Sequence, residues 1–200
     1  MENIVYSFEN SVYLNLTNKC CCACTFCIRN QMDGLGSADS LWLEKEPTQH
    51  EINEAINNFD WQGQKEVVFC GYGEPTCALD KLLETAKYIR SKMDVKLRLN
   101  TNGLSDLINK KETAKLLSEA VDEISISLNA PDEEAYLAVT RPVFGKGAFE
   151  AMLKFASECK EYAKSVKLTV VDTIPEEQIE ASKALADSLG IPLRVREFSD

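Results

Sequence analysis

The sequence has a single histidine, His50, among its 200 residues. A metal site built from several histidines is therefore excluded, and a Ser-His-Asp triad would have to use this one residue. No apolar run approaches the ~18 residues that a membrane-spanning helix needs. No charged segment followed by an apolar run is present either, so we expect no secretory signal and no membrane association.

Basic residues are also in the minority, with 22 Lys and Arg against 32 Asp and Glu and a formal net charge of −10. Lys and Arg form no stripe, so binding to nucleic acid by bulk charge is not expected. The hydrophobic content of 44% and charged content of 27% are those of a globular protein. With no linker or low-complexity tract, we expect residues 1–200 to form a single domain.

Cysteine, in contrast, is concentrated in one place: five of the eight cysteines lie between positions 20 and 27. Three of them have the spacing Cys20-x3-Cys24-x2-Cys27. A [4Fe–4S] cluster normally has four Cys ligands, so a loop that supplies three leaves one iron open to another ligand. A metal with an open position is typical of a reaction site.

Two other interpretations of these cysteines stay open. Cys24-x2-Cys27 is a zinc-type pair, but no second Cys-x2-Cys arm follows downstream. Disulfides or structural thiols are the other alternative, although eight Cys in 200 residues is far from a disulfide-dense miniprotein. Free thiols in this number require a reducing compartment, which predicts a cytoplasmic protein.

Six β-rich segments alternate with helical patterns along the chain. Such alternation predicts a parallel sheet with right-handed crossovers. Six units are two short of a closed eight-fold barrel, so the predicted fold is α/β, a partial (βα)6 TIM-type barrel open on one side. Helices are expected after the capping box Thr48-x-x-Glu51, over 79–89 and 110–120, after Pro131, from Gly147 and from Pro175 to Gly190. The predicted strands are 12–17, 66–70, 95–99, 123–128, 166–171 and 191–197.

Unusual polar and glycine residues gather at the ends of the first four predicted strands. The first ends in the cysteine loop and the second in Gly71-Tyr-Gly-Glu-Pro75. The third ends in Asn100-Thr-Asn-Gly103, and the fourth at Ser127 and Asn129. Because parallel β/α proteins place their chemistry at the carboxyl ends of strands, we expect these residues to converge. Gly71 and Gly73 would let another molecule approach the backbone, although a plain strand-to-helix turn also favours glycine.

Together these features resemble the radical S-adenosylmethionine (radical SAM) superfamily. The resemblance rests on Cys-x3-Cys-x2-Cys with Phe26 before the last cysteine, on Gly-x-Gly-Glu-Pro and on Thr-Asn-Gly, and it covers nearly the whole chain. Among its branches, the sequences Asn-Leu-Thr-Asn, Cys-Ile-Arg, Ser-Leu-Asn-Ala and Arg141-Pro142 are similar to the small TatD-associated radical SAM proteins. Extra Cys21 and Cys22 make a second register, Cys21-x2-Cys24-x2-Cys27, available; we favour Cys20 because it gives the family spacing.

The resemblance implies a role for each matching residue. Three irons would bind to the cysteines of the loop, and the methionyl amine and carboxylate of S-adenosylmethionine would chelate the fourth. The implied metal ligands are Cys20, Cys24 and Cys27. The implied cofactor-binding residues are Phe26 near the adenine; Gly71, Gly73 and Glu74 at the methionyl amine; Ser127 and Asn129 at the carboxylate or ribose; and Asn100. Asn100 stands where glycyl-radical activases carry an acidic residue, so their monovalent cation is not carried over. No residue is assigned as catalytic.

The resemblance further implies that the enzyme reductively cleaves S-adenosylmethionine to a 5′-deoxyadenosyl radical, which takes a hydrogen atom from substrate. Its expected partners are a low-potential electron donor of the flavodoxin or ferredoxin type and an unknown small-molecule or protein substrate. Three alternatives remain: activation of a partner protein by forming a glycyl radical, a ring-forming synthase of the deazaguanine type, and a non-enzymatic zinc or iron–sulfur binding module. Neither the substrate nor the role of Cys70 and Cys77 is determined by the sequence.

Overall fold

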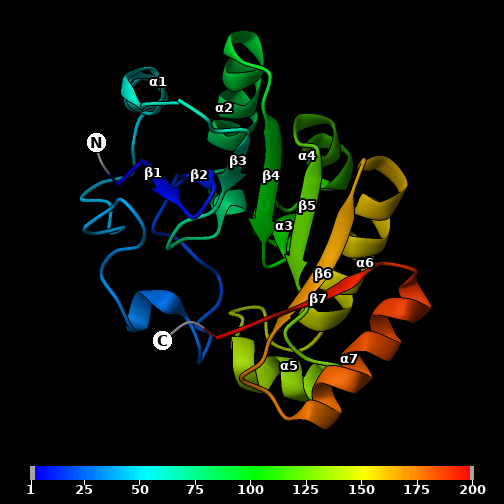
Figure 1. The fold of residues 1–200 in the computed structure, drawn as a ribbon. Helices are drawn as coiled ribbons and strands as arrows, with labels where there is room; N and C mark the ends of the chain where they lie inside the picture. Colours follow the sequence, from blue (N-terminus) through cyan, green and yellow to red (C-terminus); the bar gives the residue numbers. More distant parts are fainter. Residues whose placement is uncertain (1–2, 199–200) are drawn as a thin grey trace.

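The protein is built on one seven-stranded sheet in the computed structural model, which describes residues 3–198. The strands are hydrogen-bonded in the order of the chain, from β1 to β7, and the two end strands are not paired to each other in this part of the chain (Figure 1). Strands β2 to β7 are parallel, which confirms the predicted open partial barrel of six parallel strands. The strands are β1 Val5–Phe8, β2 Ser11–Leu14, β3 Glu66–Phe69, β4 Lys96–Thr101, β5 Glu123–Ser127, β6 Val166–Val171 and β7 Leu193–Arg196.

The prediction missed β1, which pairs antiparallel with β2 as a hairpin at one edge of the sheet. The turn of this hairpin passes through Glu9, which has a φ of 53°. A positive φ is uncommon for a residue other than glycine, asparagine or aspartate, so the local sequence carries no strong turn signal.

Helices follow the strands as expected, and one of them differs from its predicted extent. The α-helices are α1 Gln49–Asn58, α2 Leu79–Lys92, α3 Ser105–Asn109, α4 Ala114–Ala120, α5 Glu133–Thr140, α6 Ala148–Tyr162 and α7 Glu176–Leu189, and the 3-10 helices are η1 Ile28–Asn30 and η2 Pro75–Ala78. The helix predicted over 110–120 begins later than expected: Lys110 adopts a φ of 53° at the end of α3, and α4 begins at Ala114. The capping box at Thr48 and the glycine after α7 are as predicted.

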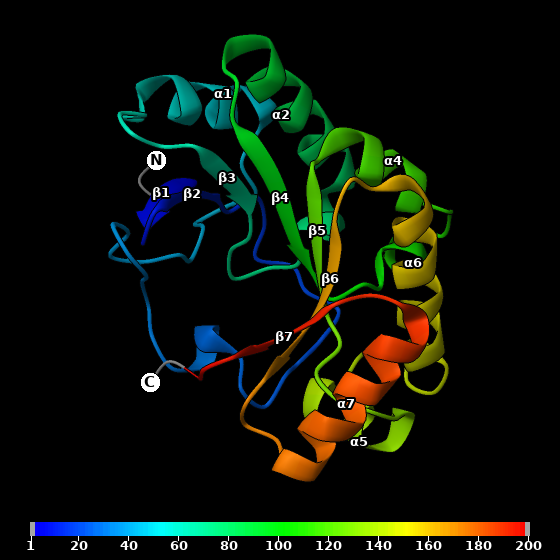
Figure 2. The ribbon, with the colours of Figure 1, turned by 45° about the vertical axis from the view of Figure 1, so that its right-hand side comes forward.

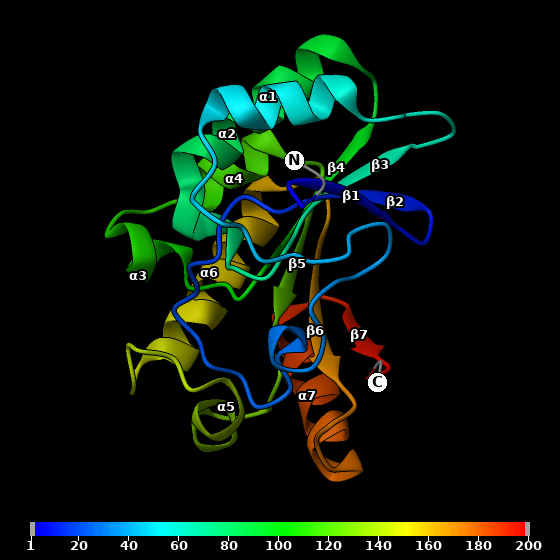
Figure 3. The ribbon, with the colours of Figure 1, turned by 90° about the vertical axis from the view of Figure 1, so that its left-hand side faces the viewer.

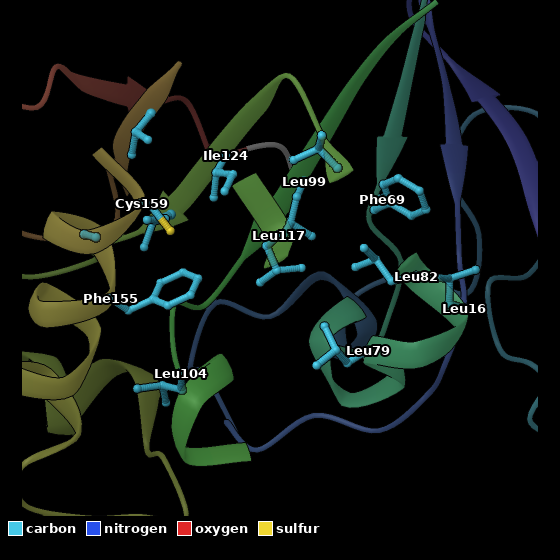
Figure 4. Close-up of a cluster of buried hydrophobic side chains, with 14 of the residues drawn as sticks. Leu16, Phe69, Leu79, Leu82, Leu99, Leu104, Leu117, Ile124, Phe155 and Cys159 are labelled. Carbon is cyan, nitrogen blue, oxygen red and sulfur yellow. The ribbon is translucent and has the colours of Figure 1, made fainter. Parts of the chain in front are cut away.

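The main hydrophobic core lies between the sheet and the helices that cover its outer face (Figure 2). Alternate strand residues point into it, as a sheet with one buried face requires. Figure 4 shows Phe69, Leu99 and Ile124 of the sheet with Leu117 and Phe155 of α4 and α6, all of which are fully buried. This layer fixes the strands, and therefore the positions of the loops at their carboxyl ends.

The opposite, inner face of the sheet is polar over much of its area. Residues 28–47, which join η1 to α1, cross the part of this face formed by β1 and β2 (Figure 3). A second, smaller cluster holds this segment in place through Tyr6, Ala38, Leu41 and Tyr72. Among the described helices, none combines the length and apolar character that a bilayer-spanning helix needs.

Candidate functional site

The cysteine loop lies at the carboxyl end of β2 and is held from two sides. On one side, the carbonyl oxygen of Lys19 accepts a hydrogen bond from the amide of Glu74 at 2.8 Å. On the other, the amide of Ala23 donates to the carbonyl oxygen of Thr140, at the end of α5, at 3.1 Å. The loop is therefore positioned by the turn after β3 and by α5, two segments distant from it in the sequence.

The five thiols of this loop divide into two groups by burial. Cys21 and Cys22 are buried, with 8% and 5% of their surface exposed, and belong to the main core. The side-chain amide of Asn102 donates to both sulfurs, at 3.2 Å to Cys21 and 3.6 Å to Cys22. The half-buried thiols are those of Cys20, Cys24 and Cys27. The three half-buried thiols are thus the ones with the predicted spacing, and their role as ligands stays a prediction.

The pKa shifts of the thiols follow this division for Cys20, Cys24 and Cys22 but not for Cys27. A hydrogen bond with the Cys22 thiol lowers the pKa of Cys20 to about 7 and also lowers the pKa of Cys24. The pKa of Cys22 is raised by its hydrogen bonds to the neighbouring thiols, and burial raises that of Cys27. Because the thiolate is the form that binds metal, Cys20 and Cys24 are better prepared ligands than Cys22.

The donor set of this loop suits an iron–sulfur cluster. Soft thiolates favour such clusters. The buried hydroxyl of Tyr136 has no hydrogen-bond partner in the described structure, and its pKa is raised first by burial and then by the charge of the nearby Cys22 sulfur. Within residues 3–198, no three His, Cys, Asp or Glu side chains are grouped to hold a single metal ion. The thiolates of a [4Fe–4S] cluster bind separate irons and need not be grouped around a single ion. The absence of a single-ion site therefore does not test the cluster ligands, which remain a prediction.

Glu74 joins the carboxyl ends of β3 and β4. It is 4% exposed, and its Oε1 accepts from the amide and hydroxyl of Thr76, at 3.1 and 2.7 Å, and from the hydroxyl of Thr101 at 2.7 Å. Within residues 3–198, its Oε2 accepts only from the amide of Asn102, at 2.7 Å. Burial raises the pKa of this carboxyl, and these four donors oppose that rise. Since a carboxylate oxygen has two lone pairs, Oε2 retains capacity for one more donor, such as an amine.

Gly71 and Gly73 are approached closely by the chain itself. A Cβ at Gly71 would lie 2.0 Å from the Oδ1 of Asn15, and a Cβ at Gly73 would lie 2.1 Å from the carbonyl oxygen of Thr17. Neither position has a positive φ. Both glycines are thus required by packing against the segment that leads into the cysteine loop, whereas their contact with a methionyl amine remains a prediction.

The other predicted cofactor residues lie along the same edge but are not all joined to the loop. Asn129 lies two residues after β5, is buried and has a φ of 61°, and its backbone amide donates to the carbonyl oxygen of Thr169 at 3.2 Å. Such a φ in a residue other than glycine is often found at functional sites. Phe26, Asn100 and Ser127 are half-buried, and no hydrogen bond in the described structure joins the last two to the cysteine loop.

Two supports of the site were missed in the sequence. Tyr72, placed between the two glycines, is 3% exposed; its hydroxyl donates to the carbonyl oxygen of Met32 and its ring packs edge-on against Trp42 at 5.1 Å. It anchors residues 28–47 over the site. Tyr136 and Thr140 of α5 are the second support, and only their helical pattern was visible in the sequence.

Comparison with known proteins relates the chain to one protein family. A profile described as the Radical SAM superfamily matches residues 14–187. No curated protein matches the chain. Members of this superfamily bind a [4Fe–4S] cluster and S-adenosylmethionine.

Several solved structures share the fold. Streptococcus suis SuiB bound to S-adenosylmethionine has a TM-score of 0.71 and 20% identity, covering 97% of this chain and 42% of that chain. SuiB bound to its precursor peptide SuiA has a TM-score of 0.71 and 19% identity, covering 98% and 41%. Native anSMEcpe with bound AdoMet has a TM-score of 0.63 and 21% identity, covering 94% and 51%. The chain thus spans about half the length of these proteins or less.

Proposed function

The chain belongs to the radical SAM superfamily of enzymes, and from that premise we propose that it binds a [4Fe–4S] cluster through Cys20, Cys24 and Cys27 and cleaves S-adenosylmethionine reductively. The division of the loop thiols carries the proposal: the three with the family spacing are half-buried, whereas Cys21 and Cys22 are buried and hydrogen-bonded to Asn102. When bound, the cluster and S-adenosylmethionine would supply one-electron cleavage to methionine and a 5′-deoxyadenosyl radical, which takes a hydrogen atom from substrate.

The chain's own residues would bind and orient these groups. Glu74 has acceptor capacity left on Oε2 for the methionyl amine, next to Gly71 and Gly73. Ser127 and Asn129 would contact the methionyl carboxylate or the ribose, and Asn100 would contribute from β4. Phe26, within the cysteine loop, would lie against the adenine.

Neighbouring segments would support this arrangement. Asn102 holds the two extra thiols in the core by donating a hydrogen bond to each of them. The segment over 28–47, held by Tyr72, would limit the access of water to one side of the site.

The finer assignments belong to the same proposal. We assign the chain to the small TatD-associated branch, with residues 1–200 as a single radical SAM core, on the sequence motifs quoted above. Its reductant would be a low-potential carrier of the flavodoxin or ferredoxin type, in a reducing cytoplasm where the free cysteines persist. A small molecule and a peptide both remain possible substrates, since the SuiB neighbour is bound to a precursor peptide.

The test is anaerobic reconstitution with iron and sulfide, followed by dithionite and S-adenosylmethionine, with 5′-deoxyadenosine measured by chromatography. We expect product from the wild type and none above background from Cys24→Ala. Cys159→Ala is the matched control, because Cys159 is a fully buried core residue of α6 outside the loop. Equal product from wild type and Cys24→Ala, or none from either, would rule the proposal out.

A further inference from the structure

The inner face of the sheet contains a polar hollow of about 540 Å³. Side chains of β4, β5, β6 and β7 line it on the face opposite the helices. Its volume is in the range of small-molecule sites. The lining residues that matter here are Arg98, Asn100, Ser125, Thr169, Arg194 and Arg196.

The carboxylates at the amino ends of the strands are already paired. Glu123 makes ion pairs with Lys96 and Lys167, and Glu66 makes them with Lys96 and with Arg98 at 3.3 Å. These bonds neutralise Lys167 within the lining. Two other acidic side chains line the hollow, Glu9 and Glu197, and both are exposed, as are Arg194 and Arg196.

Three arginines of the hollow keep unused donors. The side chain of Arg98 is 14% exposed, and its buried Nε has no hydrogen-bond partner in the described structure. Within residues 3–198, neither Arg194 nor Arg196 makes a side-chain hydrogen bond or ion pair. Arg194 lies opposite Thr169 in the β6–β7 register, and Arg196 lies opposite Val171 one step nearer the carboxyl edge.

Arginines from a central strand and from the edge strand of the sheet act on the thiol of Cys70 at the end of β3. Burial raises the pKa of the Cys70 thiol there, and the positive charges of Arg196 and Arg98 oppose that rise, together with a hydrogen bond from Asn100. Arg98 belongs to β4 and Arg196 to β7, and both line the hollow. No carboxylate bridges them in the described structure.

We propose that this hollow binds the anionic group of the substrate, a carboxylate or phosphate, through Arg98, Arg194 and Arg196. Guanidinium groups bind both anions through paired hydrogen bonds, and such charge-assisted bonds are strong. The unpaired cationic donors are a feature of this hollow and not of the whole protein, which has a net charge of −10. The identity of this ligand as the substrate rests on the function proposed above, whereas the anion site itself does not.

The experiment is isothermal titration calorimetry of the reconstituted full chain with inorganic phosphate and, separately, acetate at constant ionic strength. We expect saturable binding by the wild type and a dissociation constant raised about tenfold or more in Arg196→Gln and in Arg194→Gln. Both arginines lie on the exposed edge strand β7, so the variants should fold, which circular dichroism checks. Tighter phosphate than acetate binding indicates a phosphate-bearing substrate, and the reverse order a carboxylate.

Lys146→Gln is the matched control, because it removes one positive charge from an exposed loop outside the hollow. Three results would overturn the inference: no saturable binding of either anion, equal weakening in Lys146→Gln, or displacement of phosphate by S-adenosylmethionine. The last would assign the arginines to the cofactor's carboxylate. Wild-type protein that binds phosphate but forms no 5′-deoxyadenosine would retain the anion site and remove only the proposed function.

Discussion

Gly73 tests whether the glycines after β3 serve the fold or a ligand. In Gly73→Ala, the new Cβ would lie 2.1 Å from the carbonyl oxygen of Thr17 and 2.7 Å from that of Lys19. Real Cβ atoms are essentially never found within 3.0 Å of another heavy atom, so the backbone must move by about 1 Å. Neither oxygen can rotate away, because both belong to the main chain.

We expect this substitution to lower the free energy of unfolding by about 3 kcal/mol, at the upper end for overpacked sites. The displacement also breaks the contact between Lys19 and Glu74, so the iron content after reconstitution should fall as well. Urea denaturation of the protein before reconstitution measures the first effect, and colorimetric iron analysis measures the second.

Gly63→Ala is the matched control. A Cβ at Gly63 would meet nothing within 4 Å, and its φ of +76° imposes only the cost of a left-handed residue, about 1 kcal/mol. The packing argument is refuted if Gly73→Ala is no less stable than Gly63→Ala and loses only its affinity for S-adenosylmethionine. That result would mean that the glycine provides space for the cofactor.

Three further perturbations follow from the contacts described above. Glu74→Ala leaves four donors without their acceptor and should cost about 3 kcal/mol in urea denaturation, whereas an unchanged midpoint would mean that the carboxylate is not a structural tie. Glu51 is bonded to the side chain of Lys45 and accepts a hydrogen bond from the amide of Thr48, and these contacts lower the pKa of Glu51 from 4.5 to about 2. Glu51 therefore stabilises the fold above pH 4.5 and loses that contribution as the pH falls toward 2, so wild type and Glu51→Gln should converge in thermal stability over this range; a constant difference would contradict the assignment. Tyr72→Phe removes one hydroxyl bond and should cost about 1 kcal/mol, with faster proteolysis within residues 28–47; an unchanged cleavage rate would argue against this anchor.

Local signals in the sequence were sufficient for most of the fold. The capping box between Thr48 and Glu51 lies within four consecutive residues, and the alternation of strand residues indicates one buried face, so neither depends on distant parts of the chain. The errors arose where the backbone takes a positive φ without glycine. Glu9 turns the β1–β2 hairpin, and Lys110 ends α3 where a helix was predicted to begin, both with a φ of 53°.

The site was predictable in its position but not in its internal contacts. The order of strand ends brought the cysteine loop, the glycine turn and Asn102 to one edge, as parallel topology requires. Which thiols turn inward depends on Asn102, some 80 residues further along the chain. The hydrogen bonds that Glu74 accepts from Thr101 and Asn102 likewise form only after the sheet is assembled.

The central claim is that Cys20, Cys24 and Cys27 hold a cluster with one iron open to S-adenosylmethionine. The most direct measurement combines iron and sulfide analysis with electron paramagnetic resonance of the reduced protein, with and without S-adenosylmethionine, in wild type, Cys20→Ala and Cys21→Ala. We predict four irons and four sulfides in wild type and Cys21→Ala, a spectrum that S-adenosylmethionine changes, and no cluster in Cys20→Ala. Bound zinc, a spectrum insensitive to S-adenosylmethionine, or a cluster lost from Cys21→Ala but kept in Cys20→Ala would contradict the claim.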